Sequence, residues 1–154
     1  MEACEIMSQS LAKVYTHIVF TTKHGQCFVT DEVRAELHSY IIGTIAAMGM
    51  YTYEVYANSD HVHILTTLSR TITIADMISK IKTSSSKWLK QKGILGFDWQ
   101  DGYGIFSVSA SGVDAVTRYI RNQPKHHAKT GYKDELRLFF RKYKIEYDER
   151  YVWD

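Results

Sequence analysis

The sequence predicts an α+β fold with an antiparallel sheet, and three patterns support this. Segments rich in β-branched and aromatic residues, typical of strands, alternate with longer segments whose apolar residues recur at helical spacing. Two of the strand-like segments, 50–58 and 61–68, are separated by only two residues, which predicts a tight hairpin. The chain of 154 residues is 45% hydrophobic, enough to enclose a core. We therefore expect a single domain over residues 1–154, with residues 1–12 as a flexible N-terminus.

The first half of the chain contains a strand, a helix and the hairpin. Residues 14–22 form the first predicted strand, because most of them are β-branched or aromatic. A helix is predicted over residues 31–48, where apolar residues recur every three or four positions. Thr30 is its predicted N-cap, and Gly49 is expected to end it.

After the hairpin, a second helix is predicted to open at residues 73–76, and a short alternating strand follows at 105–109. The order strand, helix, strand, strand, helix, strand is that of the split βαβ, or ferredoxin-like, plan. We therefore expect an antiparallel sheet with helices on one face.

Two further helices are predicted near the C-terminus. The first runs from residue 112 to about residue 125, is capped by Ser111 and has Pro124 near its end. It carries Tyr119. The second covers residues 134–142.

The composition limits the class of protein. The formal net charge of +2 permits nucleic acid as a partner but does not require it. Two cysteines without metal-ligand spacing, Cys4 and Cys27, indicate a reducing compartment. No secretion signal begins the sequence, and no apolar run approaches the ~18–20 residues of a membrane span. We expect a cytoplasmic protein that does not bind membranes.

Two short motifs indicate chemistry. His61 and His63 are two apart on a predicted strand and therefore project from one face, with Val62 on the other. Tyr119 and Gln123 are four apart on a predicted helix and share a face. Two imidazoles can hold a divalent metal, an amide oxygen can complete the ligand set, and a phenol can act as a nucleophile on a phosphodiester. Each motif alone is more often structural than catalytic.

Taken together, the motifs resemble those of the HUH superfamily, and more closely the single-tyrosine transposases of the insertion-sequence 200/605 type. The resemblance extends over nearly the whole chain. It is carried by the segments 16–23, 59–65, 102–109, 119–123 and 147–153.

The resemblance implies a role for each motif residue. His61, His63 and Gln123 would hold Mg²⁺ or Mn²⁺, and Tyr119 would attack single-stranded DNA to form a 5′-phosphotyrosine and a free 3′-OH, without ATP. It also implies recognition of hairpins at the ends of the element. Members of this family act as homodimers, in which the tyrosine helix of one subunit lies against the histidine pair of the other.

Other histidines and the basic residues are assigned from their surroundings. His17 is expected to fill a structural position beside the sheet, and His126 and His127 are expected at the surface. Cations mixed with hydroxyls in segment 79–88, and a second basic cluster after residue 117, are suited to phosphate contacts. The predicted DNA-binding residues are Lys80, Lys82, Lys87 and Arg121.

Four alternatives stay open from the sequence. The first is a ferredoxin-like module that binds single-stranded DNA or RNA without cutting it, although the aromatic pattern of RNA-recognition domains is absent. The second is a replication-initiation or relaxase-like nickase, and the third is a metal-dependent hydrolase in which Tyr119 is structural. The fourth is a domesticated relative that acts on chromosomal repeats.

Overall fold

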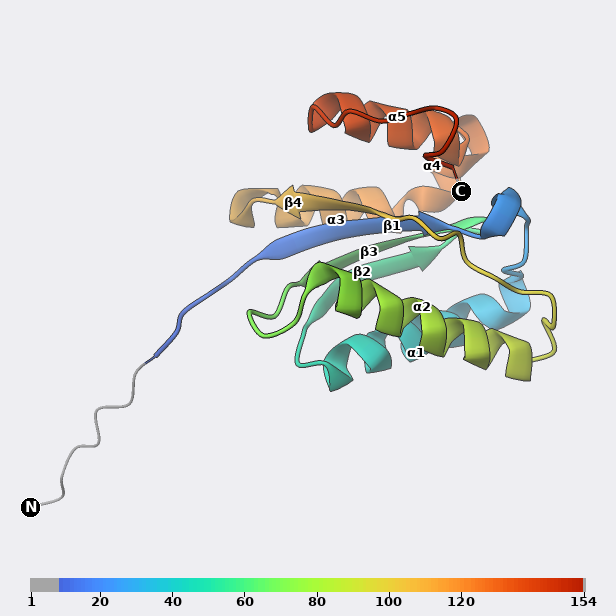
Figure 1. The fold of residues 1–154 in the computed structure, drawn as a ribbon, viewed down its shortest axis with the longest axis horizontal. Helices are drawn as coiled ribbons and strands as arrows, with labels where there is room; N and C mark the ends of the chain where they lie inside the picture. The colour runs from blue at the N-terminus through green and yellow to red at the C-terminus, as the bar shows by residue number, and fades with distance from the viewer. Residues whose placement is uncertain (1–8, 154) are drawn as a thin grey trace, which may run out of the picture.

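A four-stranded antiparallel sheet forms the centre of the molecule (Figure 1). The computed structural model describes residues 9–153, apart from the side chains of residues 127 and 128. Within this range the strand order is β2-β3-β1-β4, which confirms the ferredoxin-like plan. Most of the predicted N-terminal segment, including Cys4, lies outside the described residues. The strands are β1 (Tyr15–Thr21), β2 (Thr52–Ala57), β3 (His61–Thr67) and β4 (Gly104–Val108).

Helices cover both faces of the sheet (Figure 1). One face carries α1 (Asp31–Ala47) and α2 (Ile74–Gln91), as the ferredoxin-like plan predicts. The opposite face carries the C-terminal helices, which include the predicted tyrosine-bearing helix. These are α3 (Val113–Arg121), α4 (Gln123–Lys129) and α5 (Tyr132–Lys142), preceded by a short 3-10 turn at Ala110–Gly112; another such turn lies at Lys23–Gly25.

Both faces of the two central strands are buried, since helices lie on each side of the sheet. Alternate residues of β1 and β3, such as Ile18 and Ile64, pack into the main core with α1 and α2. The intervening residues face the C-terminal helices, and three of these are histidines: His17, His61 and His63. Imidazoles completely removed from water need polar partners, so this second layer is where a site can form.

The ends of the first two helices follow the sequence prediction. Thr73 is the N-cap of α2, and its hydroxyl accepts a hydrogen bond from the backbone N–H of Asp76 at 3.1 Å. Thr30 is the N-cap of α1, but its side chain makes no capping bond. Gly49 follows the last turn of α1 with φ +80°, a left-handed conformation that glycine adopts without strain.

The predicted third helix over residues 112–125 is wrong in two respects. Ser111 does not cap it, because residues 110–112 form the 3-10 turn and Gly112 is the N-cap of α3. The helix also breaks at Asn122, and a separate helix, α4, begins with Gln123. Pro124 lacks a backbone N–H and suits the first turn of a helix, so it starts α4 where a continuous helix would need a donor.

None of the helices within residues 9–153 combines the length and the apolar character that a bilayer-spanning segment needs.

Candidate functional site

The histidine pair lies at the centre of the site. His61 and His63 project from the same face of β3, as predicted, and both are buried. Their ring centroids are 5.1 Å apart. Because β3 is a central strand, the two rings are held on a rigid support with helices packed above them.

His61 is oriented by residues of the β2–β3 turn. Its Nδ1 lies 2.7 Å from Oδ1 of Asp60, and its Nε2 lies 3.0 Å from the side-chain nitrogen of Asn58. An amide NH₂ group only donates, so Nε2 accepts this bond and is unprotonated, while Nδ1 carries the proton toward the carboxylate. A carboxylate behind a histidine in this way fixes the ring that presents its other nitrogen to a metal.

His63 faces two groups. Its Nδ1 is 2.8 Å from Nε2 of His17, so His17 does have a supporting role beside the sheet. Its Nε2 is 2.6 Å from Oε1 of Glu135, yet Nε2 has no hydrogen-bond partner within the described residues. The second carboxylate oxygen of Glu135, Oε2, is also buried without one there.

These orphaned atoms fit a bound cation. In the tautomer in which Nδ1 of His63 donates to His17, the nitrogen facing Glu135 carries only a lone pair, as the carboxylate oxygens do. His61, His63 and Glu135 offer ligand atoms that all lie within 4.8 Å of one another. Burying electron-pair donors against each other is costly unless a positive charge joins them.

Glu135 was missed by the sequence analysis. It lies in the first turn of α5, is 4% exposed, and comes from a helix far along the chain from the histidines. Its one sequence signal is its place on the apolar side of an amphipathic helix, next to Leu136 and four residues before Phe139. A glutamate on such a face needs a charged or polar partner.

Tyr119 lies against the histidines from α3. Its ring centroid is 5.8 Å from that of His63, and its hydroxyl lies against the side chains of Glu135 and Gln123. Burial, together with the negative charge of Glu135, raises the pKa of Tyr119 well above its usual value. The phenol therefore keeps its proton in the metal-free protein.

Gln123, the first residue of α4, completes the cluster and is fully buried. Its Oε1 accepts a hydrogen bond from Asn58 at 2.9 Å, and its Nε2 donates to Oε1 of Glu135 at 3.3 Å. The break between α3 and α4 therefore does not separate Gln123 from Tyr119. The structure brings the four predicted residues His61, His63, Tyr119 and Gln123 together within one chain.

The charge states suit a metal site. Burial lowers the pKa of His63 despite the neighbouring Glu135, and burial lowers that of His17 well below its usual value. Burial alone would raise the pKa of Glu135, but contact with Tyr119, and with His63 in the tautomer whose Nε2 carries the proton, lowers it instead. Neutral imidazoles beside an ionised carboxylate are the forms that bind a divalent cation.

The predicted DNA-binding residues lie elsewhere. Lys80, Lys82 and Lys87 are on α2, across the sheet from the histidines; Lys80 and Lys87 are exposed, whereas Lys82 donates to backbone carbonyls. Arg121 is at the end of α3, where it donates to Glu54 of β2 at 3.1 and 3.2 Å. The sequence had placed these residues only by charge.

Of the two C-terminal histidines, His126 is exposed, and its ring centroid is 4.8 Å from that of Tyr119. The side chain of His127 lies outside the described residues. His126 therefore lies at the surface, as predicted, but at the rim of the site.

The fold matches those of solved transposases. A structure assigned as a transposase from Deinococcus radiodurans R1 superposes with a TM-score of 0.59 at 23% identity, over 76% of this chain and 98% of that one. A REP-associated tyrosine transposase bound to a REP hairpin superposes with a TM-score of 0.57 at 15% identity, over 80% of this chain and 76% of that one. At these identities the likeness shows the fold alone. No curated protein matches the chain.

The sequence family is shown directly. Residues 10–123, well over half of the chain, match the family model described as "Transposase IS200 like", and the chain belongs to this family. The match contains His61, His63, Tyr119 and Gln123 and ends before Glu135.

Proposed function

We propose that this protein cleaves and rejoins single-stranded DNA through a covalent link to Tyr119. The observation that carries the proposal is the position of a half-buried phenol against His61, His63 and Glu135 in one chain. A tyrosine nucleophile beside a cation site is suited to phosphodiester transfer, in which charge develops on the phosphate oxygens. Membership of the IS200-like transposase family supports this reading.

In the proposed reaction the Tyr119 oxygen attacks a phosphorus of the DNA backbone. The new oxygen–phosphorus bond makes a 5′-phosphotyrosine, the bond to the 3′ oxygen breaks, and that oxygen takes a proton to become a 3′-OH. A second 3′-OH then attacks the phosphotyrosine, restores a phosphodiester and releases Tyr119. One phosphoester bond replaces another at each step, so no ATP is consumed.

The buried cluster would hold Mg²⁺ or Mn²⁺ through His61, His63 and Glu135. Gln123, the third ligand implied by the family resemblance, lies beside this set. When bound, the cation polarises the scissile phosphate and stabilises the phenolate form of the nucleophile. The protein's own groups orient the reaction: Glu135 and Gln123 hold the Tyr119 hydroxyl, while Asp60 and His17 fix the two imidazoles.

The proposed DNA substrate contains a hairpin next to an unpaired segment. Support comes from the structurally similar REP-associated tyrosine transposase, which was solved with a REP hairpin. An unpaired segment exposes its backbone without the cost of unstacking a duplex. Action as a homodimer, a cytoplasmic location and a single domain over residues 1–154 stay predictions.

Trapping the covalent intermediate tests the proposal. The protein is incubated with Mn²⁺ or Mg²⁺ and labelled single-stranded oligonucleotides taken from the DNA that flanks its gene, and a denaturing gel shows whether label migrates with the protein. We expect a metal-dependent adduct that Tyr119→Phe abolishes and His61→Ala strongly reduces.

The variants decide between the remaining functions. An adduct that survives Tyr119→Phe would assign the nucleophile to another residue. Cleavage without an adduct would favour a hydrolase, and tight binding without cleavage would favour a binding module. Metal binding by Tyr119→Phe serves as the control that this variant keeps an intact site.

A further inference from the structure

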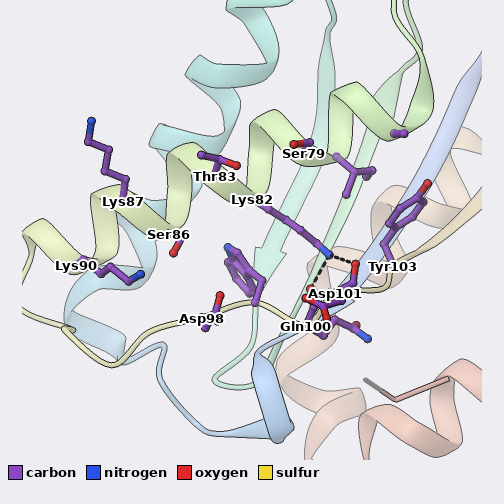
Figure 2. Close-up of a pocket in the computed structure, with 13 residues that line it drawn as sticks. Ser79, Lys82, Thr83, Ser86, Lys87, Lys90, Asp98, Gln100, Asp101 and Tyr103 are labelled. Carbon is purple, nitrogen blue, oxygen red and sulfur yellow. Dashed lines mark hydrogen bonds between the residues drawn. The ribbon is translucent and has the colours of Figure 1, made fainter. Parts of the chain in front are cut away.

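A cleft lies outside the site described above, between α2 and the segment 98–103 that leads into β4 (Figure 2). Its volume is about 590 Å³, within the range of ~300–1,000 Å³ typical of ligand sites. Lysines and hydroxyls of α2 form one side, and the other side is an irregular segment of backbone. A bound ligand would therefore meet a row of polar side chains facing a wall of peptide groups.

Segment 98–103, which forms this wall of the cleft, is held in place although it has little regular structure. The indole of Trp99 donates to the hydroxyl of Ser85 at 2.9 Å. Gln100 bonds to the end of β1 twice: its N–H donates to the Thr21 carbonyl at 2.9 Å, and its Oε1 accepts from the Thr21 N–H at 2.7 Å. A segment bound at several points presents its groups to a ligand without first having to become ordered.

Lys82 holds the same wall from the helix. Its Nζ donates to the carbonyls of Gln100, Asp101 and Gly102 at 2.8, 3.2 and 2.6 Å, and two of these bonds are drawn in Figure 2. Burial lowers the pKa of Lys82 to about 8, although nearby aspartates oppose this. All three donor positions of the ammonium are used, so Lys82 positions the wall and has none left for a phosphate.

The cations that remain available lie along the helix. Lys87 and Lys90 are exposed, line the cleft and make no ion pair within the described part of the chain. Three hydroxyl side chains share this side of α2, at helical spacing: Ser79, Thr83 and Ser86. From Ser79 to Lys90 the helix rises ~16 Å, the length of several stacked nucleotides at ~3.4 Å each.

The far end of the cleft offers an aromatic ring. Tyr103 is 41% exposed, and the Lys82 ammonium lies 5.7 Å from its ring centroid. This cation–π contact supports the ring from within the cleft, and the exposed part of the side chain is open to a ligand. Figure 2 shows Lys87 and Lys90 toward one end of the cleft and Tyr103 toward the other.

The distribution of charge gives the orientation of a ligand. Lys87 and Lys90 favour phosphates along α2, whereas Asp98 and Asp101 line the wall and repel them. Aspartate oxygens instead accept hydrogen bonds from the amino groups of bases, and an aromatic ring stacks on a base. A base can stack on Tyr103 only when it is unpaired, because a duplex buries the faces of its bases.

We infer that this cleft binds an unpaired segment of the DNA substrate, with its phosphates on Lys87 and Lys90 and a base on Tyr103. The inference rests on the proposed function. Gln100 connects the cleft to the catalytic residues, because it bonds to Thr21, and Thr21 pairs with His61 across β1 and β3. A strand leaving the cleft around this end of the sheet would reach the histidines.

Binding measured without catalysis tests the inference. A labelled single-stranded oligonucleotide from the DNA flanking the gene is titrated with Tyr119→Phe protein by fluorescence anisotropy, without divalent metal and at several salt concentrations. Lys87→Gln and Lys90→Gln should each weaken binding and reduce the slope of log K against log salt by about 0.7. Tyr103→Leu should weaken binding about 5- to 150-fold and leave the slope unchanged. Lys13→Gln, an exposed lysine outside the cleft, is the control for loss of one charge.

Three results would overturn the inference. In the first, Lys80→Gln weakens binding as much as Lys90→Gln. Because Lys80 lies on the same helix but outside the cleft, this result would mean that the charge of the helix, and not the cleft, binds DNA. In the second, Tyr103→Leu has no effect. In the third, a fully paired duplex of the same sequence binds more tightly than the single strand and shows the same losses. Unchanged thermal unfolding confirms that each variant is folded.

The two proposals fail separately. If the wild-type protein forms no covalent adduct but the cleft variants lose affinity, the proposed reaction is wrong and the cleft stands. If the adduct forms and the cleft variants bind DNA like the parent protein, the reaction stands and the cleft is not its DNA site.

Discussion

Replacing Glu135 by glutamine separates a metal ligand from a structural glutamate. The substitution keeps the shape of the side chain but replaces one carboxylate oxygen with an amide NH₂ group. In the metal-free protein that group can donate to the orphaned Nε2 of His63, which is 2.6 Å from Oε1 of Glu135. We therefore expect the free energy of unfolding without metal to be unchanged or higher.

With metal the same variant should be less stable than the wild type. Free Mn²⁺ at 100 times its Kd stabilises a protein by about 2.7 kcal/mol, or about 5–11 °C in Tm for a domain of ~150 residues. Loss of one group that supports a metal weakens binding about 10- to 100-fold. At the same Mn²⁺ concentration the remaining stabilisation would be about 0.4–1.4 kcal/mol, or about 1–6 °C.

The assay is thermal unfolding with and without Mn²⁺, together with calorimetric titration of Mn²⁺ alone. Gln123→Leu is the matched variant, because Gln123 is buried beside Glu135 and is the ligand implied by the family resemblance. If Glu135→Gln binds Mn²⁺ as tightly as the wild type while Gln123→Leu does not, the reasoning from the orphaned atoms is refuted. The ligand set is then His61, His63 and Gln123.

Three further predictions concern assembly, pH and a helix cap. Because the cluster is complete in one chain, mixing Tyr119→Phe with His61→Ala should not restore adduct formation; restoration would demonstrate a site shared between subunits. Burial lowers the pKa of His17, so at mildly acidic pH its imidazole is protonated in the unfolded chain but neutral in the folded protein. The free energy of unfolding of the metal-free protein, measured by urea denaturation, should therefore fall as the pH drops below ~6.5. The same decrease should be smaller in His17→Phe. Thr73→Ala should cost about 1 kcal/mol and Thr30→Ala almost nothing in the same measurement, because only Thr73 makes a capping bond; equal costs would contradict this.

Local periodicity explains why much of the site could be predicted. The positions of His61 and His63 on one face follow from the two-residue repeat of a strand, whatever packs against it. Tyr119 and Gln123 are four residues apart, and their side chains meet in spite of the helix break at Asn122. The break itself was missed because a proline signal is compatible with either the end of one helix or the first turn of the next.

Charge was a poorer guide than periodicity. Lys82 and Arg121 were predicted to contact phosphates, but Lys82 donates to the carbonyls of the cleft wall and Arg121 donates to Glu54. A lysine or arginine binds whichever acceptor the fold brings within reach, and the acceptors here come from other elements. The number of basic residues in a segment therefore does not show which of them are available to DNA.

The sequence by itself determined the order of the strands and helices, the histidine pair and the pairing of Tyr119 with Gln123, because each depends on residues close together in the chain. Only the tertiary structure decided that Glu135 completes the cluster, that one chain contains all of it, and that a fixed wall faces the lysines of α2. These features arise where α5 and segment 98–103 pack against distant parts of the sheet. Contacts between layers depend on the whole packed core, and no local repeat in the sequence encodes them.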